Sequence, residues 1–201
     1  MSQGLHEFFW HDAHVVRLPG RLITLRDWSV DDLPPLRHWL APEQPWHDTD
    51  GPYFGRPTPR DVAGQLSRFT ALATIPEDVL PNPRDSLAIA ATGSDRLLGQ
   101  VNWYWEDQHT DWRRMGLAIY DEAEWGHGNG SEALKLWTSY LFDTTDALRL
   151  DFATYSGNPG MIAIGHKLGF TQEAVFRQAR RWPGGVHDAI VFGVLRTEWA
   201  N

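Results

Sequence analysis

Residues 120–134 read YDEAEWGHGNGSEAL and hold three glycines at alternate positions, Gly126, Gly128 and Gly130. A β-rich run, MGLAIY at residues 115–120, precedes them, and a segment of helical character follows. Strand, glycine-rich turn and helix N-terminus together make an anion site, because unpaired N–H groups and the positive end of the helix dipole point at one place. Glycines also let the backbone approach a phosphate without a Cβ in the way. The stretch therefore predicts a phosphate cradle, with an ordinary glycine-containing helix start as the plainer alternative.

Composition narrows the class of protein. The 201 residues suit one domain of α/β size with a core of its own. The absence of cysteine excludes a disulfide framework and thiol chemistry, and it fits a cytoplasmic location. The formal net charge of −8 disfavours binding to nucleic acid or to an anionic membrane. No apolar stretch approaches the roughly 20 residues that a membrane helix needs.

Residues 1–20 are expected to form an extension in front of a domain that covers residues 21–199. The extension has no apolar region of the kind found in secretory signals, and it ends at Pro19-Gly20. His11 and His14 resemble a metal-binding pair, but no further ligand lies at helical spacing. No metal site is therefore predicted.

The order of elements after residue 20 predicts one mixed α/β domain without repeats or a dividing linker. Ser29 and Thr58 are expected to cap helices, with Pro59 at the first helical position of the second. A helix over residues 131–142 should follow the glycine turn, and another should run from Asn158-Pro159 to Gly169. Strands are expected at residues 21–26, 86–91, 97–106, 112–120, 148–154, 171–178 and 187–195.

This order, together with three motifs, resembles the GNAT superfamily of acyl-CoA N-acyltransferases, in particular its RimJ/RimL-like branch, over roughly residues 21–199. WGHGNG at residues 125–130 matches the coenzyme-pyrophosphate loop, with Trp125 where Gln or Arg commonly stands. SGN at residues 156–158 and HKLGF at residues 166–170 match the Asn-containing turn and the end of the helix that follows it. The resemblance implies a twisted mixed sheet of six to seven strands with helices on both faces. It also implies an N-acetyltransferase that uses acetyl-CoA as co-substrate.

The resemblance further implies which residues hold the coenzyme. Main-chain groups of Ile119 and Tyr120 would hold the pantetheine arm and polarise the thioester carbonyl. Asn158 would hydrogen-bond the same arm, and it also fits a helix N-cap before Pro159; the two roles are compatible. The expected coenzyme-binding residues are Ile119, Tyr120, Trp125, Gly126, His127, Gly128, Asn129, Gly130, Ser131 and Asn158.

A dinucleotide-binding oxidoreductase is one alternative, because residues 126–131 nearly read G-x-G-x-x-G/A and Asp151 lies at about the distance of a ribose-binding acid. Three features count against it. An acidic connector, residues 121–125, separates strand from glycines; Ser131 takes the third glycine position; and strand-like residues follow Asp151. A P-loop is excluded because the Gly-Lys-Ser/Thr end is missing.

The proton-handling residues that many family members carry are absent from this chain. Arg114 aligns with a strand glutamate, Gly165 with a helix tyrosine and Met161 with a serine. Catalytic residues cannot be transferred from the family. A non-catalytic acyl-CoA-binding protein is therefore the second alternative.

The hairpin around residues 107–111 suggests a replacement. If Glu106 and Trp112 pair across the turn, Tyr104 lies opposite Arg114, and alternation puts Asn102, Tyr104, Glu106 and Arg114 on one face. Glu106 is then the candidate base, although an ion pair with Arg114 is the preferred interpretation. Tyr104 and Arg114 are the candidate substrate contacts.

The expected acceptor is a primary amine, at a protein N-terminus or in a small molecule. An α-amino group with a pKa of about 7.7–8.0 is partly neutral at neutral pH, whereas a lysine near 10.4 costs about 3 kcal/mol more to deprotonate. A site without a strong base suits the α-amino group. Tyr53-Phe54, the aromatic run 103–105 and the arginine-bearing run 177–182 lie on elements that frame the acceptor groove in this family. No nucleic acid or membrane is expected as a partner, and a homodimer stays open.

Overall fold

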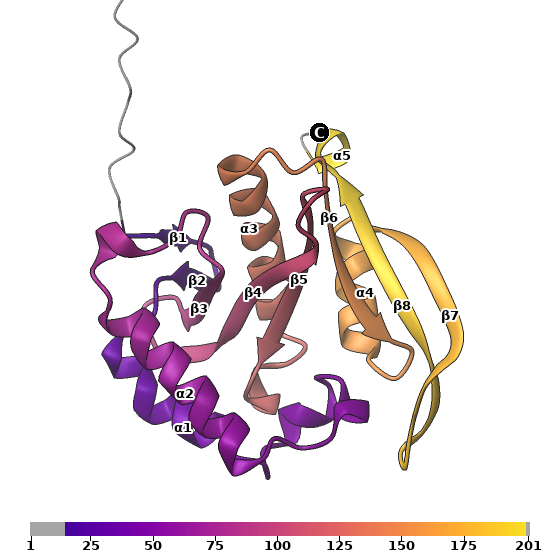
Figure 1. Ribbon diagram of the computed structural model, residues 1–201, viewed down its shortest axis with the longest axis horizontal. Coiled ribbons are helices and arrows are strands. Elements are labelled where there is room, and N and C mark those ends of the chain that lie inside the picture. The colour runs from indigo at the N-terminus through magenta and orange to yellow at the C-terminus, as the bar shows by residue number, and fades with distance from the viewer. Residues whose placement is uncertain (1–14, 200–201) are drawn as a thin grey trace, which may run out of the picture.

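The computed structural model describes residues 15–199, so the predictions for residues 1–14, including the pair His11 and His14, lie outside it. The described chain forms a single mixed sheet covered by helices (Figure 1). The strands are β1 (Arg17–Pro19), β2 (Ile23–Arg26), β3 (Ser86–Ala91), β4 (Leu97–Asp107), β5 (Trp112–Ile119), β6 (Arg149–Tyr155), β7 (Thr171–Trp182) and β8 (Gly185–Leu195). The α-helices are α1 (Leu33–Trp39), α2 (Pro59–Thr74), α3 (Asn129–Thr144), α4 (Pro159–Lys167) and α5 (Arg196–Trp199). Short 3₁₀-helices are η1 (Val30–Asp32), η2 (Pro45–Asp48), η3 (Pro52–Phe54), η4 (Glu77–Val79) and η5 (Glu122–Glu124).

The eight strands lie in the order β1-β2-β3-β4-β5-β6-β8-β7, and only β5 and β6 are parallel neighbours. The predicted α/β class with a mixed sheet is confirmed, but the sheet has one strand more than the six to seven expected. The additional strand is β1, which pairs with β2 from Arg17↔Arg26 to Pro19↔Thr24. Its three residues are too few for an alternating pattern, so the last part of the predicted extension belongs to the sheet.

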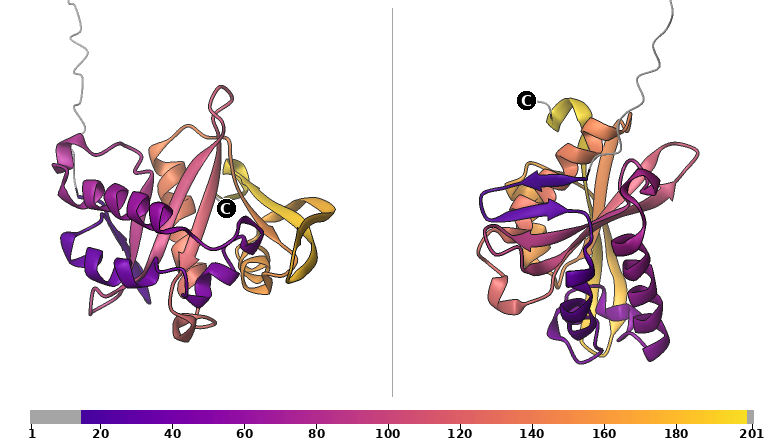
Figure 2. Two further views of the ribbon diagram at one scale, coloured as in Figure 1. Left: turned by 60° about the horizontal axis from the view of Figure 1, so that its bottom comes forward. Right: turned by 90° about the vertical axis from the view of Figure 1, so that its left-hand side faces the viewer.

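Helices cover both faces of the sheet. Trp137 and Leu141 of α3 pack with Phe152 of β6 and Phe192 of β8 in the larger core. On the other face, α1 and α2 enclose a second core around Tyr120. Figure 2 shows α2 crossing one face of the strands while α3 lies behind them. The predicted two-sided arrangement is therefore confirmed.

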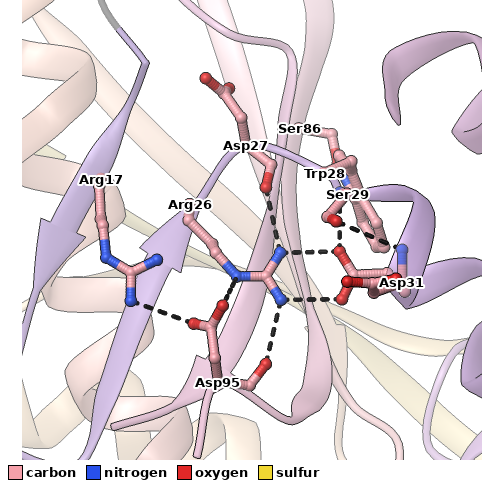
Figure 3. A network of polar contacts seen from close by, with 9 residues as sticks. Arg17, Arg26, Asp27, Trp28, Ser29, Asp31, Ser86 and Asp95 are labelled. Atoms are coloured by element: carbon pink, nitrogen blue, oxygen red, sulfur yellow. Dashed lines mark hydrogen bonds and ion pairs between the residues drawn. The ribbon is translucent and has the colours of Figure 1, made fainter. Parts of the chain in front are cut away.

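Local signals for the helix starts are confirmed. The Ser29 hydroxyl accepts from the Asp31 N–H, and the Asp32 carboxylate accepts from the Ser29 N–H at 2.9 Å. The same Asp32 carboxylate binds the buried Arg26 guanidinium through two hydrogen bonds of 2.7 and 2.8 Å. Figure 3 shows Arg26 between this turn and Asp95, so a buried ion pair fastens η1 to β2, and a second, half-exposed pair with Asp95 fastens β2 to the β3–β4 turn.

The β4–β5 hairpin follows the predicted register except at its end. Tyr104 pairs with Arg114 as expected, but Asp107 rather than Glu106 pairs with Trp112. A bulge between Trp105 and Asp107 inserts one residue, which a strict alternation cannot anticipate. Glu106 therefore has no partner across the ladder.

Strands β5 and β6 separate soon after they meet. They pair over three positions, from Arg113↔Leu150 to Met115↔Phe152. β5 then continues to Ile119 and β6 to Tyr155 without further pairing. In open α/β sheets the space outside the carboxyl ends of separating strands is where ligands bind. The fold therefore places a gap beside the glycine-rich turn.

Candidate active site

A cleft of about 440 Å³ opens where β5 and β6 separate. Its walls come from the end of β5, the glycine loop, one side of α4 and the chain around η2. The structure brings most of the expected coenzyme-binding residues to this cleft: Ile119, Trp125, Gly126, Gly128, Gly130, Ser131 and Asn158 line it. Tyr120, His127 and Asn129 are not among the lining residues.

The glycine loop has the backbone conformation that an anion cradle requires. Gly126 and Gly128 have φ angles of 76° and 94°, in the left-handed region that favours glycine. Gly128 caps α3 without a side chain, and the first helical bond runs from the Glu132 N–H to the Gly128 carbonyl at 3.0 Å. The three N–H groups before it, at residues 129–131, have no intrahelical acceptor, and they form the positive end of the helix dipole. This N-terminus is suited to hold a phosphate.

Two side chains of the loop brace it from behind. The Trp125 indole donates to the Ile119 carbonyl at 2.9 Å, which ties the loop to the end of β5. The buried Asn129 amide donates to the main-chain and side-chain oxygens of Glu124, both at 3.1 Å. Trp125 and Asn129 thus support the loop, and Trp125 also lines the cleft.

Ile119 and Tyr120 differ in what they offer to a ligand. The Tyr120 N–H donates to the Leu98 carbonyl at 2.9 Å, and its side chain is fully buried against Trp46. Because alternate residues of an antiparallel strand bond to the same neighbour, the main-chain groups of Ile119 point away from β4; the carbonyl accepts a hydrogen bond from the Trp125 indole, and the N–H is left for a ligand in the gap. Ile119 is therefore placed to align an acyl group, and Tyr120 is not.

Asn158 is placed both to cap α4 and to offer a hydrogen bond to a ligand in the cleft. Its Oδ1 accepts from the Met161 N–H at 3.0 Å and caps α4. Its Nδ2 donates to the Thr49 carbonyl at 3.1 Å, which leaves one amide hydrogen for a ligand. The residue thus caps the helix and still lines the cleft.

Tyr104, Glu106 and Arg114 lie away from the cleft. Arg114 donates to the fully buried Asp151 at 2.8 and 3.1 Å, at the point where β5 and β6 still pair. Glu106 contacts the same guanidinium at 2.8 Å, which is the ion pair preferred for it. None of the three lines the cleft. Asp151, the candidate ribose acid of the dinucleotide alternative, is occupied by Arg114 and by the Trp112 indole at 2.6 Å.

Two charged groups of the cleft were missed in the sequence. Asp50 follows η2 in a loop without periodicity, and Lys167 was noted only as part of a helix-closing motif. Asp50 makes no hydrogen bond or ion pair within residues 15–199. Its side chain is exposed, but partial desolvation by the surrounding walls raises its pKa, and the charge of protonated His47 offsets part of that rise. No sequence signal marked Asp50, because its position depends on contacts with distant segments.

The aromatic residues expected near the acceptor come together only in part. Tyr53 of η3 packs on Tyr155 of β6 and on Trp182 of β7, and the Arg180 guanidinium lies 4.4 Å from the Tyr53 ring centre. His187 stacks on Trp182 at 4.5 Å. Phe54 is 80% exposed and lies at the edge of this cluster. Trp103 and Trp105 instead flank the Arg113 guanidinium.

Comparisons with known proteins agree with this geometry. Residues 22–171 match the family model of the acetyltransferase (GNAT) domain, so the chain belongs to the GNAT acetyltransferases. An uncharacterized N-acetyltransferase, p20 of Bacillus licheniformis, is 23% identical over 180 residues, which is 89% of this chain and 96% of the relative.

Two solved structures illustrate the likeness in fold. A GNAT acetyltransferase from Bacillus anthracis superposes with a TM-score of 0.71 at 13% identity, covering 91% of this chain and 100% of the other. RimL, a ribosomal L7/L12 alpha-N-protein acetyltransferase solved with coenzyme A, gives 0.67 at 15% identity, covering 90% and 98%.

The predicted GNAT membership, with a fold like that of RimL, is confirmed, and the protein is an N-acetyltransferase of a family that uses acetyl-CoA. This family assignment supports neither a dinucleotide-binding oxidoreductase nor a non-catalytic acyl-CoA-binding protein. Within residues 15–199, no helix combines the length and the apolar character needed to cross a membrane.

Proposed function

We propose that this protein transfers the acetyl group of acetyl-CoA to a primary amine, at a protein N-terminus or in a small molecule, by direct attack on the thioester. One observation supports the proposal above all others. The left-handed glycines at the start of α3 turn unpaired N–H groups toward the gap between β5 and β6. A phosphate held there places the rest of the coenzyme along the end of β5.

Each wall of the cleft contacts a different part of acetyl-CoA in the proposed reaction. The N–H groups of residues 129–131 bind the pyrophosphate, and Lys167 supplies the positive charge that Trp125 lacks. The main chain of Ile119 and the remaining amide hydrogen of Asn158 align the pantetheine arm and the thioester. Alignment of amine and carbonyl is then the largest contribution of the site.

An α-amino acceptor is favoured over a lysine side chain. The lysine amine, with a pKa near 10.4, costs about 4–5 kcal/mol to deprotonate at pH 7, whereas an α-amino group near 8 costs about 1 kcal/mol, a difference of about 3 kcal/mol. The fold similarity to RimL, which bears the name of an alpha-N-protein acetyltransferase, points the same way. Peptides with a free N-terminus are therefore the first acceptors to try.

The test combines ligand retention with turnover. Mass spectrometry of the purified protein should find retained coenzyme A, and release of free thiol should follow when acetyl-CoA is mixed with a panel of amines. The panel holds trialanine amide, an N-acetylated lysine amide and small primary amines. Tight coenzyme binding without turnover on any amine would indicate a binding protein, and retained NAD(P) would contradict the whole proposal.

A glycine substitution tests the phosphate cradle. Gly126→Val should lower the affinity for coenzyme A tenfold or more in calorimetry, because a side chain then enters the cleft. Gly93→Val, in the β3–β4 turn, is the matched control. Both glycines are left-handed, at φ 76° and 91°, and neither has an atom within 4 Å of an added Cβ. Unchanged affinity in a folded Gly126→Val protein would exclude the cradle.

Gly128 and Gly130 are less suitable for this test, although both line the cleft. An added Cβ at Gly128 would meet Leu22 at 3.3 Å, and one at Gly130 would meet Ile164 at 3.0 Å. Gly130 therefore also lets α3 pack against α4. Substitutions there would mix loss of packing with loss of coenzyme binding.

A further inference from the structure

Residues 46–50 bridge the two strands that separate. On the β5 side, the Trp46 ring packs on Tyr120, which directly follows β5, with ring centres 5.1 Å apart. On the β6 side, Tyr155 at the end of the strand donates its hydroxyl to the Asp48 carbonyl at 2.9 Å. In Figure 1 this violet segment lies between the lower ends of β5 and β6. The bridge closes the open end of the gap.

Asp50 is held at the mouth of the cleft by this bridge. Asn158 donates to the carbonyl of the preceding residue, Thr49, at 3.1 Å, which fixes the chain next to α4. Asp50 then lines the cleft together with Ile119 and Asn158, the two residues placed to align the thioester. The aromatic cluster around Tyr53 lies beyond this bridge, on the side of the acceptor-framing elements.

Asp50 is the unengaged carboxylate of the cleft within the described chain. The other acidic group that lines it, Glu124 of η5, is bound by an arginine and by the glycine loop. Lys167 of α4 is the cationic lining group. His47, from the same segment, acts on Asp50, and burial together with the charge of Asp50 raises the pKa of Tyr120, which directly follows β5. Asp50 is exposed at this place, so its unpaired carboxylate is free to receive a cation that enters the cleft.

We propose that Asp50 receives the ammonium group of the acceptor and takes one proton from it; this rests on the proposed function. The neutral amine nitrogen attacks the thioester carbonyl carbon, so a C–N bond forms and the C–S bond breaks. The sulfur leaves with the electron pair of that bond and takes the second amine proton, which yields free coenzyme A. Asp50 returns its proton to solvent once the amide has left.

The electrostatics of the mouth suit this role. The residue is exposed, but the walls around it partly desolvate its carboxylate and raise the pKa of Asp50 above the ordinary value, which makes it a better proton acceptor than a fully hydrated carboxylate. Burial lowers the pKa of His47, so the imidazole is mostly neutral near pH 7 and attracts the Asp50 carboxylate only at more acidic pH, where it is protonated. Because a protonated Asp50 cannot accept a proton, activity should fall as the pH drops through this raised pKa.

The test is the variant Asp50→Asn, assayed with acetyl-CoA and trialanine amide. We expect kcat/KM to fall by roughly 10²–10⁴ and the acidic limb of the pH profile to move to the pKa of the free α-amino group, about 8, since the amide keeps the shape but takes no proton and only amine that arrives neutral can react. Coenzyme A affinity in calorimetry and the melting temperature should not change. Asp50→Glu, which keeps a carboxylate, should restore part of the activity. Glu43→Gln, an exposed acid earlier in the same loop, is the control and should stay within about twofold.

Each outcome separates the two proposals. Wild-type kinetics and pH profile in Asp50→Asn would overturn the role of Asp50 and leave the acetyltransferase proposal standing. A loss of activity accompanied by weaker coenzyme binding or a lower melting temperature would also overturn it, because a structural role would then explain the loss. Absence of turnover by the wild-type protein on every amine would contradict the proposed function itself, and the role of Asp50 with it.

Discussion

Glu106 meets Arg114 at 2.8 Å while its side chain remains 34% exposed. Such a pair contributes about 0–1 kcal/mol to stability, and Arg114 keeps Asp151 as its buried partner. We therefore expect Glu106→Gln to change kcat/KM by less than about threefold, as measured in the thiol-release assay. A hundredfold loss with intact coenzyme binding and an unchanged melting temperature would contradict this and make Glu106 the base.

Residues whose function follows from local sequence were predictable. The glycines of residues 126–130 and the cap at Asn158 depend on backbone geometry that neighbouring residues dictate. The role of Asp50 was not predictable, because distant residues hold its loop in place. The hydrogen bonds from Tyr155 to Asp48 and from Asn158 to Thr49 join residues that are 107 and 109 positions apart in the chain. A single sequence shows no sign of such pairs.

The attachment of α3 to the sheet depends on one carboxylate. Glu132, in the first turn, accepts hydrogen bonds from the N–H groups of Arg21, Leu22 and Ile23 at 2.8, 2.6 and 2.9 Å. It thereby holds the helix that bears the cradle against the start of β2. Glu132→Gln should lower the free energy of unfolding by about 1–3 kcal/mol, because N–H groups lose an ionised acceptor.

The same clamp should depend on pH. Desolvation alone would raise the pKa of Glu132, but the three N–H groups outweigh it and lower the pKa below its ordinary value. Its stabilisation is therefore complete above about pH 5 and is lost as the pH falls through the lowered pKa. Thermal unfolding should show the gap between wild type and Glu132→Gln closing on acidification below about pH 4. A gap that stays constant, as expected for the exposed control Glu77→Gln, would contradict the clamp.

At the level of elements, the helices were easier to predict than the sheet. The boxes at Ser29 and Thr58 and the left-handed Gly169 are encoded within a few residues, and each marks a helix end in the structure. β1 and the bulge before Asp107 were missed because they depend on pairing with another strand. β7 extends to Trp182, beyond the predicted end, for the same reason.

In the whole molecule, Asp151 holds the two parts of the sheet together just before β5 and β6 separate. It is fully buried and binds Trp112 and Arg114 of β5 from its own place on β6. Asp151→Asn should lower the free energy of unfolding by about 3–5 kcal/mol, since the Arg114 guanidinium loses its buried counter-charge and keeps only the partly exposed Glu106. Urea unfolding measures this, with the exposed Asp143→Asn as control. A change below about 1 kcal/mol would show that the pair adds little.

The separation of β5 and β6 has a mechanical consequence. Strands β1 to β5 and strands β6, β8 and β7 are joined in the main chain by only three residue pairs, so the sheet has a narrow waist. The cleft lies beside that waist, and its walls belong to both parts: residues 125–131 follow β5, and α4 follows β6. A coenzyme bound there would contact both parts of the sheet at once. The protein with coenzyme bound should therefore need a larger force to pull β5 and β6 apart than the protein without it.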